Sequence, residues 1–454
     1  MKIFNNKNYI TKLVFLYLLI SVFLLCYTFF QAEITHDGNQ FNYYKKYYLI
    51  FIFATLFWFL SLFLNDKKKI IVLYFSTTII FILYFYETLR FYAPEINKSK
   101  IMRFISNDTK LAKQIDENSK INIIDELKKT KGIDVVPSVF PQALVKKNLD
   151  LFPLGGVSNT TTVFCREGDE YSIYVSDRFG FNNLDKEWSN NNLSWFLVGD
   201  SFTQGSCVLQ HENFASQIIN ITRESAISVG MSGNGPLIEL ATIKEYATHK
   251  KPKNVLWIYF ERNDLEDLKK EKTNFLLMKY MNKDFTQNLL LKQKEIDKKL
   301  RKNILIAERE LKSRDILKRE KIKKFTAFNK IIRLKIVRDK MALDRGLNFG
   351  IDPLFKKIIL EAKNHINEWG GKLFFVYLPD KERYSSNKAN DDNYLKRKEV
   401  IKLIKMLNIP IVDVHKDFFM KQDDPLSFYA HRIYGHFNPE GYKRIAELII
   451  KKAK

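Results

Sequence analysis

The feature that most constrains the fold is a series of five short apolar segments separated by stretches with helical patterning. These segments cover about residues 194–199, 225–229, 254–260, 372–378 and 409–414. The first contains Trp195–Val198, and a continuous apolar run of this kind is typical of a strand that is buried on both faces. Strands that alternate with helices favour a parallel sheet covered by helices. The sequence therefore predicts an α/β domain with a flavodoxin-like parallel sheet over about residues 191–454.

The first predicted strand ends in a segment that could carry chemistry. Gly199 ends the apolar run, and Ser201 follows at the expected start of the next helix. Free backbone N–H groups at a helix N-terminus can stabilise developing negative charge. An Asp-Ser pair after a strand is also common capping chemistry, so this segment alone does not establish a nucleophile.

Three further residues have the chemistry that a nucleophilic serine requires. A serine hydroxyl needs an imidazole to take its proton, and His436 lies in a short loop before the expected start of a helix at Asn438 and Pro439. A tetrahedral intermediate needs converging hydrogen-bond donors, which Gly233 and Asn263 could supply. Each residue alone is more typical of a turn, a cap or a loop, and only their joint order favours catalysis.

In this order, the four segments resemble the SGNH/GDSL hydrolase superfamily. The matching blocks are GDSFTQG at 199–205, SVGMSGNGP at 228–236, FERNDL at 260–265 and GHFNPEGY at 435–442. The resemblance implies the SGNH hydrolase fold, with Ser201 as the nucleophile and His436 as the general base. It also implies an oxyanion hole formed by the backbone N–H groups of Ser201 and Gly233 and the side-chain amide of Asn263. No cofactor is expected, and the sequence has no metal-ligand spacing.

The sequence departs from the family pattern at two positions. Ile433 stands three residues before His436, where the family has an aspartate. Either His436 works in a Ser-His dyad, or an acid from elsewhere in the chain reaches its other nitrogen, and Asp424 is the candidate. Arg262 stands directly before Asn263, where related sequences often carry glycine. It could point toward the cleft or toward solvent, and solvent is favoured.

The N-terminal part of the chain predicts a membrane anchor over residues 1–92. Three apolar runs, at about 13–30, 47–64 and 70–86, are each near the minimum length for a transmembrane helix. The first run lacks the small residues of a signal-peptide cleavage site, so an uncleaved anchor is expected.

The lysines around these runs predict the orientation of the anchor. Lysines precede the first run and fill the turn at Lys67–Lys69, which favours the cytoplasmic side for both, although Lys45 and Lys46 argue against it. The prediction is a multi-pass protein of the inner (plasma) membrane whose catalytic domain faces the periplasm or the cell exterior.

Residues 93–190 are expected to form an extracytoplasmic connecting region with short strands. The phrase at Asp177–Asn183 recurs in membrane-linked relatives of the superfamily, where it could shape the cleft. Cys165 and Cys207 could form a disulfide in an oxidising compartment, or could equally be two unpaired small hydrophobic residues.

A long basic insertion is predicted at about residues 268–345. Its apolar residues recur at helical spacing and indicate one or two long amphipathic helices. These residues are Leu289, Ile296, Leu300, Ile304, Leu311, Ile316, Leu317, Ile322, Phe325 and Phe328. A solvated helical hairpin packed on the core is favoured over a partner-binding coiled coil, and a lid over the cleft is a further alternative.

The charge balance narrows the choice of partners. The chain has 74 Lys and Arg residues against 51 Asp and Glu residues, a formal net charge of +23. Such a surface attracts anions, and the lipid headgroups of a membrane or an acidic glycan fit better than nucleic acid, for which no motif is present. A general compositional bias of the protein would give the same excess of basic over acidic residues, without any function.

Together these observations predict a membrane-anchored serine esterase that acts on O-acyl groups of a cell-surface polysaccharide. The same Ser-His chemistry would serve an O-acyltransferase, with a membrane-bound acyl donor as partner. A lipid esterase and a non-catalytic carbohydrate-binding module are the remaining alternatives.

Overall fold

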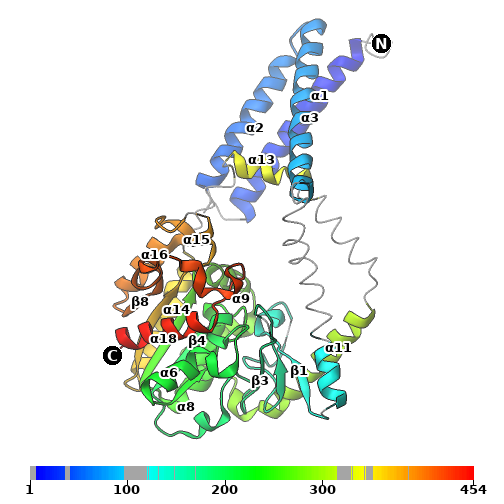
Figure 1. Ribbon diagram of the computed structural model, residues 1–454. Helices are drawn as coiled ribbons and strands as arrows, with labels where there is room; N and C mark the ends of the chain where they lie inside the picture. Colours follow the sequence, from blue (N-terminus) through cyan, green and yellow to red (C-terminus); the bar gives the residue numbers. More distant parts are fainter. Residues whose placement is uncertain are drawn as a thin grey trace. The chain divides into compact units, whose positions relative to one another are not determined.

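The computed structural model describes residues 7–35, 41–96, 120, 122–130, 132–147, 149–168, 170–313, 329, 331–341, 343, 351–386 and 388–453 (Figure 1). The chain divides into two units. The helical unit comprises residues 1–113 and 313–350, and the sheet unit comprises residues 114–312 and 351–454.

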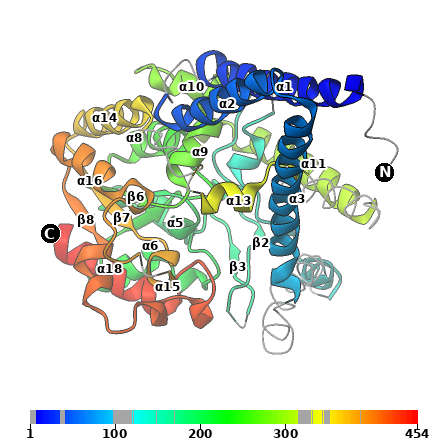
Figure 2. The same cartoon turned by 90° about the horizontal axis from the view of Figure 1, so that it is seen from above.

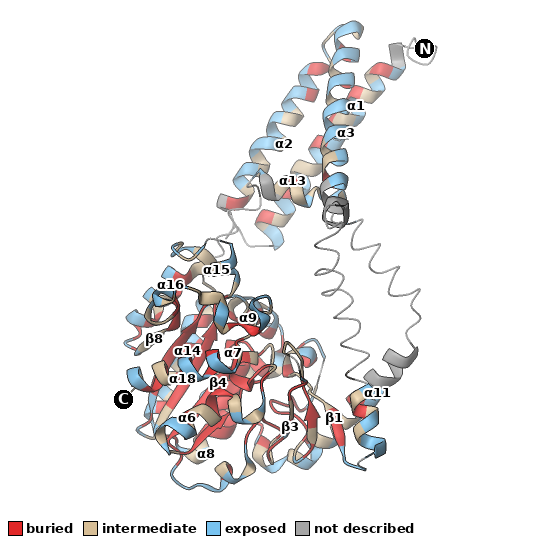
Figure 3. Ribbon diagram, in the orientation of Figure 1, coloured by how far each residue is buried: buried red, intermediate tan, exposed pale blue. Residues whose placement is uncertain are grey.

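The helical unit is built from three long helices. These are α1 (Lys7–Phe29), which continues into a π-helix at Phe30–Thr35, α2 (Phe41–Ser61) and α3 (Asp66–Ile96). They pack through a small apolar cluster that includes Val14, Trp58 and Leu73, while most of their other large apolar side chains are exposed (Figure 3).

Two stretches of this unit, Tyr9–Thr35 and Asp66–Leu89, are long and apolar enough to cross a membrane. The sequence predicted three such spans. The second predicted span forms helix α2, but that helix does not pass the same test of length and composition. It begins at Phe41 and includes Lys45, Lys46 and several tyrosines in its first half, and these residues lower its mean hydropathy.

The helical unit also contains the short helix α13 (Lys335–Lys340), which comes from the long insertion and packs against α3 (Figure 2). The buried carboxylate of Glu87 on α3 accepts the backbone N–H groups of Ile336 at 2.8 Å and Val337 at 2.9 Å. Glu87 thereby satisfies N–H groups that the start of a helix leaves unpaired. The insertion therefore contributes to both units of the chain.

The sheet unit contains a five-stranded parallel sheet. Its strands are β4 (Trp195–Gly199), β5 (Ala226–Ser228), β6 (Asn254–Phe260), β7 (Lys372–Leu378) and β8 (Ile411–Asp413). The strand order is β5-β4-β6-β7-β8, which is the flavodoxin-like order. The predicted α/β fold with a parallel sheet is confirmed.

Helices cover both faces of this sheet, and strands β4, β5, β6 and β7 are therefore buried on both sides, while the edge strand β8 is partly buried (Figure 3). On β6, Val255 and Trp257 face one apolar core and Leu256 and Ile258 face the other. The first core includes residues of α7 (Pro236–Thr242), α14 (Pro353–Asn367) and α16 (Arg397–Met406). The second includes residues of α6 (Phe214–Thr222) and α18 (Pro439–Ala453).

Residues before β4 belong to the sheet unit as well. Strands β1 (Val135–Pro137), β2 (Thr161–Val163) and β3 (Ile173–Val175) form a separate three-stranded sheet, in which β1 and β2 are parallel and β2 and β3 are antiparallel. Phe152 and Phe181 from this region lie in the same apolar core as β6. The boundary expected at residue 190 does not separate two units, because Val136, Phe152 and Phe181 of the connecting region share an apolar core with the large sheet.

The first part of the insertion differs from the expected long helices. It contains two short helices, α9 (Asp264–Glu271) and α10 (Phe275–Met278). A long helix, α11 (Gln293–Ser313), follows them. The predicted apolar residues Leu289, Ile296, Leu300 and Ile304 are buried in the core of the sheet unit. Of the remaining predicted positions, the side chain of Leu311 and all of Ile316, Leu317, Ile322, Phe325 and Phe328 lie outside the described residues.

The shorter elements connect these layers. They are 3-10 helices at Pro141–Leu144, Asp185–Ser189, Gln210–Glu212, Lys279–Met281, Leu289–Leu291, Tyr394–Lys396, Phe419–Lys421, Pro425–Phe428 and Ala430–Arg432, a π-helix at Ile243–Ala247, and the short helices α5 (Ser201–Gln204), α8 (Thr248–Lys250), α15 (Glu382–Ser385) and α17 (Val414–Asp417).

Candidate active site

Ser201 lies at the carboxyl end of β4, where the chain turns sharply into α5. Gly199 permits this turn, because an added Cβ would lie 2.1 Å from Thr203 Oγ1 and 2.7 Å from the Ile258 carbonyl oxygen. Asp200 caps the helix by accepting the backbone N–H of Phe202 at 3.0 Å. As the first residue of α5, Ser201 has a backbone N–H without an intrahelical partner.

The imidazole of His436 lies directly against this serine. Ser201 Oγ is 2.9 Å from His436 Nε2, which is within the range that proton transfer requires. His436 comes from the loop before α18, and the backbone pairing of Tyr429 with Phe437 anchors that loop. The ring of Phe202 packs against the His436 ring with centroids 4.9 Å apart.

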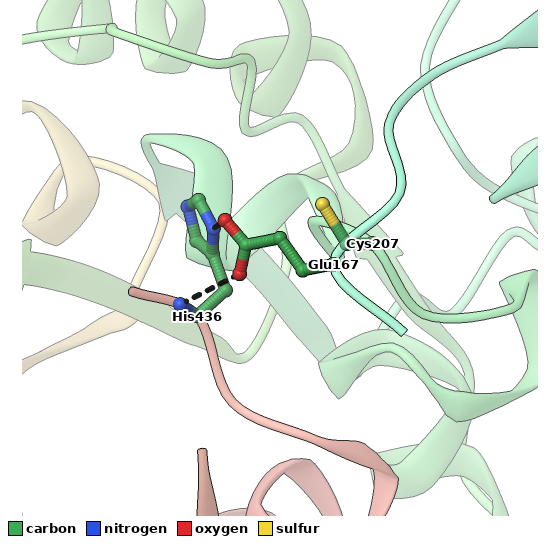
Figure 4. Close-up of side chains that lie close together, drawn as sticks. All are labelled: Glu167, Cys207 and His436. Carbon is green, nitrogen blue, oxygen red and sulfur yellow. Dashed lines mark hydrogen bonds and ion pairs between the residues drawn. The ribbon is translucent and has the colours of Figure 1, made fainter. Parts of the chain in front are cut away.

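The other side of the imidazole is held by Glu167 (Figure 4). Glu167 Oε1 lies 2.8 Å from His436 Nδ1, and Glu167 Oε2 accepts the backbone N–H of His436 at 3.0 Å. One carboxylate therefore fixes both the ring and the backbone of the histidine. A hydrogen on Nδ1 donated to Glu167 leaves Nε2 free to accept the proton of Ser201, which is the arrangement of a serine-histidine-acid triad.

Charge and burial shift the pKa values of this pair in the directions that fit an ion pair. Burial opposes the charged form of His436, but the hydrogen bond and the charge of Glu167 outweigh it and raise the pKa of the histidine. Burial also opposes the charged form of Glu167, but the hydrogen bonds and charge of His436 lower the pKa of that carboxyl. Burial raises the pKa of the neighbouring Asp200 to about 6.

The acid on His436 is Glu167 and not Asp424, the candidate that the sequence offered beside a Ser-His dyad. Asp424 lies 2.6 Å from Arg432 in a largely exposed ion pair, whereas Glu167 takes the position on Nδ1. Ile433, which replaces the family aspartate, is 52% exposed. The incomplete motif is thus completed by a carboxylate 269 residues earlier in the chain.

Arg262, the second departure from the family pattern, is held by two carboxylates. Its guanidinium lies 2.7 Å from Asp380 and also contacts Glu382. These neighbours balance the cation, so Arg262 presents no isolated charge to the serine.

The predicted oxyanion donors come from the loops after β5 and β6. Asn263 Nδ2 donates to Asp267 Oδ2 at 2.8 Å and, over a longer 3.4 Å, to Asp200 Oδ2 beside the serine. Gly233 has φ +76°, a left-handed conformation that favours glycine. The structure thus joins Asn263 to the residue that precedes Ser201, and one of its amide hydrogens is held only weakly.

Helix α5 also positions the Gly233 loop. Gln204 Oε1 accepts the backbone N–H of Ser232 at 2.8 Å and its hydroxyl at 3.1 Å. An added Cβ on Gly233 would lie 3.3 Å from the Cβ of Gln142. The serine and the residue before Gly233 are therefore anchored on the same short helix.

A disulfide between Cys165 and Cys207 lies next to Glu167, and their Cα atoms are 5.0 Å apart. The sequence analysis left this pairing open. Glu167, Cys207 and His436 present ligand-type atoms within 4.8 Å of one another, but the sulfur of Cys207 is committed to the disulfide (Figure 4). With the bond closed, the group offers one carboxylate and one imidazole.

The segment Asp177–Asn183 forms hydrogen bonds with the elements that carry the site. Asn183 pairs with the backbone N–H and carbonyl of Ser228 on β5 at 2.8 and 2.7 Å, and Asn182 donates to the Gln204 carbonyl at 2.8 Å. Asp177 accepts side-chain hydrogen bonds from Asn183 and Trp188. This segment therefore fixes both β5 and α5, the two elements that lead to Gly233 and Ser201.

Comparisons with known proteins add little to this geometry. No family model matches the sequence, and no curated protein matches it. Among solved structures, the chain is similar to a lipase/acylhydrolase from Enterococcus faecalis, with 12% identity over 57% of this chain and 94% of that chain and a TM-score of 0.30. A likeness of this size carries no argument about activity, so any functional conclusion depends on the site itself.

Proposed function

We propose that this chain is a serine ester hydrolase of the SGNH type. The observation that carries the proposal is the position of His436, which lies between the hydroxyl of Ser201 and the carboxylate of Glu167. The resemblance of the four sequence blocks to the superfamily supports the same roles. Ser201 is the nucleophile, His436 the general base and Glu167 the acid that orients and stabilises the histidine.

The reaction follows from these roles. Ser201 Oγ attacks the ester carbonyl carbon while His436 Nε2 takes its proton, and the carbonyl oxygen becomes an oxyanion. The bond to the alcohol then breaks, and the proton on Nε2 passes to the departing oxygen. Water repeats the sequence on the acyl-serine, which releases the carboxylic acid and restores Ser201.

The oxyanion is stabilised by the backbone N–H groups of Ser201 and Gly233 and by the side chain of Asn263. The long bond from Asn263 to Asp200 is the one that an oxyanion replaces, while the shorter bond to Asp267 keeps the amide in place. Loss of one such donor typically costs about 100- to 1,000-fold in kcat.

The proposed substrate is an O-acyl group on a cell-surface polysaccharide, and the proposed location is the inner (plasma) membrane, with the sheet unit on its outer side. Two membrane-length helices support attachment to a membrane, and a disulfide supports an oxidising compartment. The net charge of +23 favours an anionic glycan or lipid surface.

The test is hydrolysis of p-nitrophenyl esters from acetate to octanoate by the full chain in detergent. We expect turnover that is fastest with acetate and is lost in Ser201→Ala and His436→Gln. Asp424→Asn serves as the matched control and should keep wild-type turnover. Turnover that survives Ser201→Ala would contradict the proposal, and a preference for octanoate would favour a lipid ester.

A separate experiment with an O-acetylated polysaccharide tests whether water or a sugar hydroxyl accepts the acyl group. Release of acetate that requires Ser201 supports hydrolysis. Appearance of acetyl groups on an added unmodified glycan, without free acetate, would instead identify an acyltransferase that uses the same triad.

A further inference from the structure

We propose that the Cys165–Cys207 disulfide is a positioning device that holds the Glu167 carboxylate on His436, so that full activity requires the bond to be closed. The inference rests on the proposed function. It assigns to Cys165 and Cys207 a role that the catalytic roles of Ser201 and His436 do not require.

Glu167 lies in a loop that extends past the end of the small sheet. The pairing of β2 with β3 continues as far as Cys165 and Ser172, because Phe164 N–H donates to the Ser172 carbonyl at 2.9 Å and Ser172 N–H donates to the Cys165 carbonyl at 2.8 Å. Glu167 comes two residues after Cys165, beyond the last of these bonds. Its position therefore depends on how the two ends of this loop are anchored.

Both ends of the loop are anchored to the same short segment after α5. Cys165 is bonded to Cys207, and the hydroxyl of Ser172 donates to the Val208 carbonyl at 2.6 Å. Cys207 follows Ser201 by six residues, and Ser206 N–H donates to the Ser201 carbonyl at 3.0 Å. The disulfide thus ties the acid to the helix that carries the nucleophile.

The backbone at Cys207 is consistent with a held position. Its φ is +59°, which is a left-handed conformation. For any residue other than glycine this conformation is unfavourable, and it persists only where the surrounding structure imposes it. Figure 4 shows the Cys207 sulfur beside the side chain of Glu167. Opening the bond removes the covalent anchor. It leaves non-covalent contacts with this segment, among them the hydrogen bond of Ser172 to Val208 and the 3.6 Å approach of Cys165 Sγ to Ser206 Oγ.

The bond opens by thiol-disulfide exchange. A dithiol reductant supplies two electrons and two protons, the bond between the two sulfurs breaks to give two thiols, and the reductant closes to its own disulfide. With the loop released, the carboxylate spends less time on Nδ1 of His436. A chain made in a reducing compartment would therefore acquire its complete triad only after oxidation.

The experiment compares the effect of reduction in two backgrounds of the full chain in detergent. Both carry Cys26→Ser, because Cys26 is the remaining cysteine, and one also carries Glu167→Gln. Each protein is assayed oxidised, after dithiothreitol and after reoxidation. EDTA is present, because the opened bond would place a thiol next to the Glu167 carboxylate and the imidazole.

We expect reduction to slow ester turnover about tenfold or more when Glu167 is present, because replacing the triad acid by its amide lowers kcat about 10,000-fold in a comparable triad. Reoxidation should restore the rate. In the Glu167→Gln background, reduction should change the residual rate by less than about twofold. Ser172→Ala, which removes one of the non-covalent anchors and leaves the disulfide intact, should make the rate of the Glu167-containing protein more sensitive to reduction.

A second readout does not require turnover. The pKa of His436 is followed by NMR of isotope-labelled histidine rings, and its signal is assigned by its loss in His436→Gln. The charged groups that act on this ring are Glu167, from the loop, and Asp200, from the start of α5, while Lys381 acts on Glu167. Reduction should lower the pKa of His436 toward its value in Glu167→Gln, while Asp200 remains in place.

Two results would overturn the proposal. One is an equal fold-loss of turnover on reduction in both backgrounds, which would make the disulfide a general support of the fold. The other is a pKa of His436 that stays unchanged when the bond opens. A chain that lacks turnover but shows the expected change of this pKa would contradict the proposed hydrolase function and leave the positioning role standing.

Discussion

At the scale of single residues, the carboxylate of Glu167 determines what His436 can do. It accepts hydrogen bonds from the histidine at Nδ1 and at the backbone N–H. The side chains of Glu167 and His436 are both only partly accessible to solvent. This contact favours the tautomer in which Nε2 accepts a proton, and in the proposed mechanism it stabilises the imidazolium that forms when Ser201 attacks the ester. The contact therefore predicts both the rate and its pH dependence.

We predict that Glu167→Gln lowers kcat about 10,000-fold and moves the pH profile of kcat/KM toward lower pH. Activity requires neutral His436 and so rises with pH through the histidine pKa. Burial opposes the charged imidazole, and Glu167 outweighs it to hold that pKa above its usual 6.5. Without Glu167 the raising effect is lost, and the midpoint of the acidic limb should fall.

The measurement is kcat/KM from pH 5 to 9 in the wild type, Glu167→Gln and Asp424→Asn. Asp424→Asn should match the wild type, because Asp424 pairs with Arg432 and does not contact the histidine. An unchanged midpoint in Glu167→Gln would show that Glu167 does not act on His436.

Glu167 also shows where prediction from sequence ends. Ser201, Gly233, Asn263 and His436 follow strands or precede a helix, and these positions can be recognised from the local pattern. Glu167 lies in a loop 269 residues before the histidine that it contacts, and no spacing rule connects them. The sequence did contain one indication of the position of Glu167. A disulfide between Cys165 and Cys207 would bring residue 167 close to α5.

At the scale of elements, the five strands of the large sheet could be predicted because each lies in a short apolar run between stretches with helical patterning. The insertion could be predicted only in part. Its helical periodicity identified Ile296 and Leu300 as buried positions, but periodicity does not specify the surface against which a helix packs. α11 packs on the sheet unit, whereas α13 packs on α3.

We predict that Leu300→Ala lowers the free energy of unfolding of the sheet unit by about 2–5 kcal/mol, because it leaves a cavity in a closed core. Leu305→Ala on the same helix is the matched control, since Leu305 is 53% exposed and its loss should cost less than about 0.5 kcal/mol. Denaturant unfolding followed by tryptophan fluorescence measures both. Equal effects would mean that α11 does not pack through Leu300.

At the scale of the whole molecule, the chain couples a helical unit with membrane-length helices to a sheet unit that carries the triad. The helical unit includes the insertion segment around α13, which the Glu87 carboxylate caps. The separation of an N-terminal helical part from the sheet domain was predicted from sequence. The return of residues 313–350 to the helical unit could not be predicted, because that segment has the same basic, amphipathic composition as α11.

We predict that the full chain stays with membranes in alkaline carbonate, because the exposed apolar side chains on α1 and α3 favour insertion into a bilayer. Protease added to intact spheroplasts should cleave the sheet unit, since the catalytic side is proposed to lie outside. Release into the carbonate supernatant would contradict membrane insertion, and protection from protease would reverse the orientation.

The most direct test of the account is labelling of the full chain with a fluorophosphonate probe, followed by peptide mapping. The probe bonds to a serine that is activated by a base, so it reports the nucleophile whether the acyl acceptor is water or a sugar. We expect a single adduct on Ser201, absent in His436→Gln, formed much more slowly in Glu167→Gln and at an unchanged rate in Asp424→Asn. An adduct on another serine, or equal labelling in Glu167→Gln and the wild type, would contradict it.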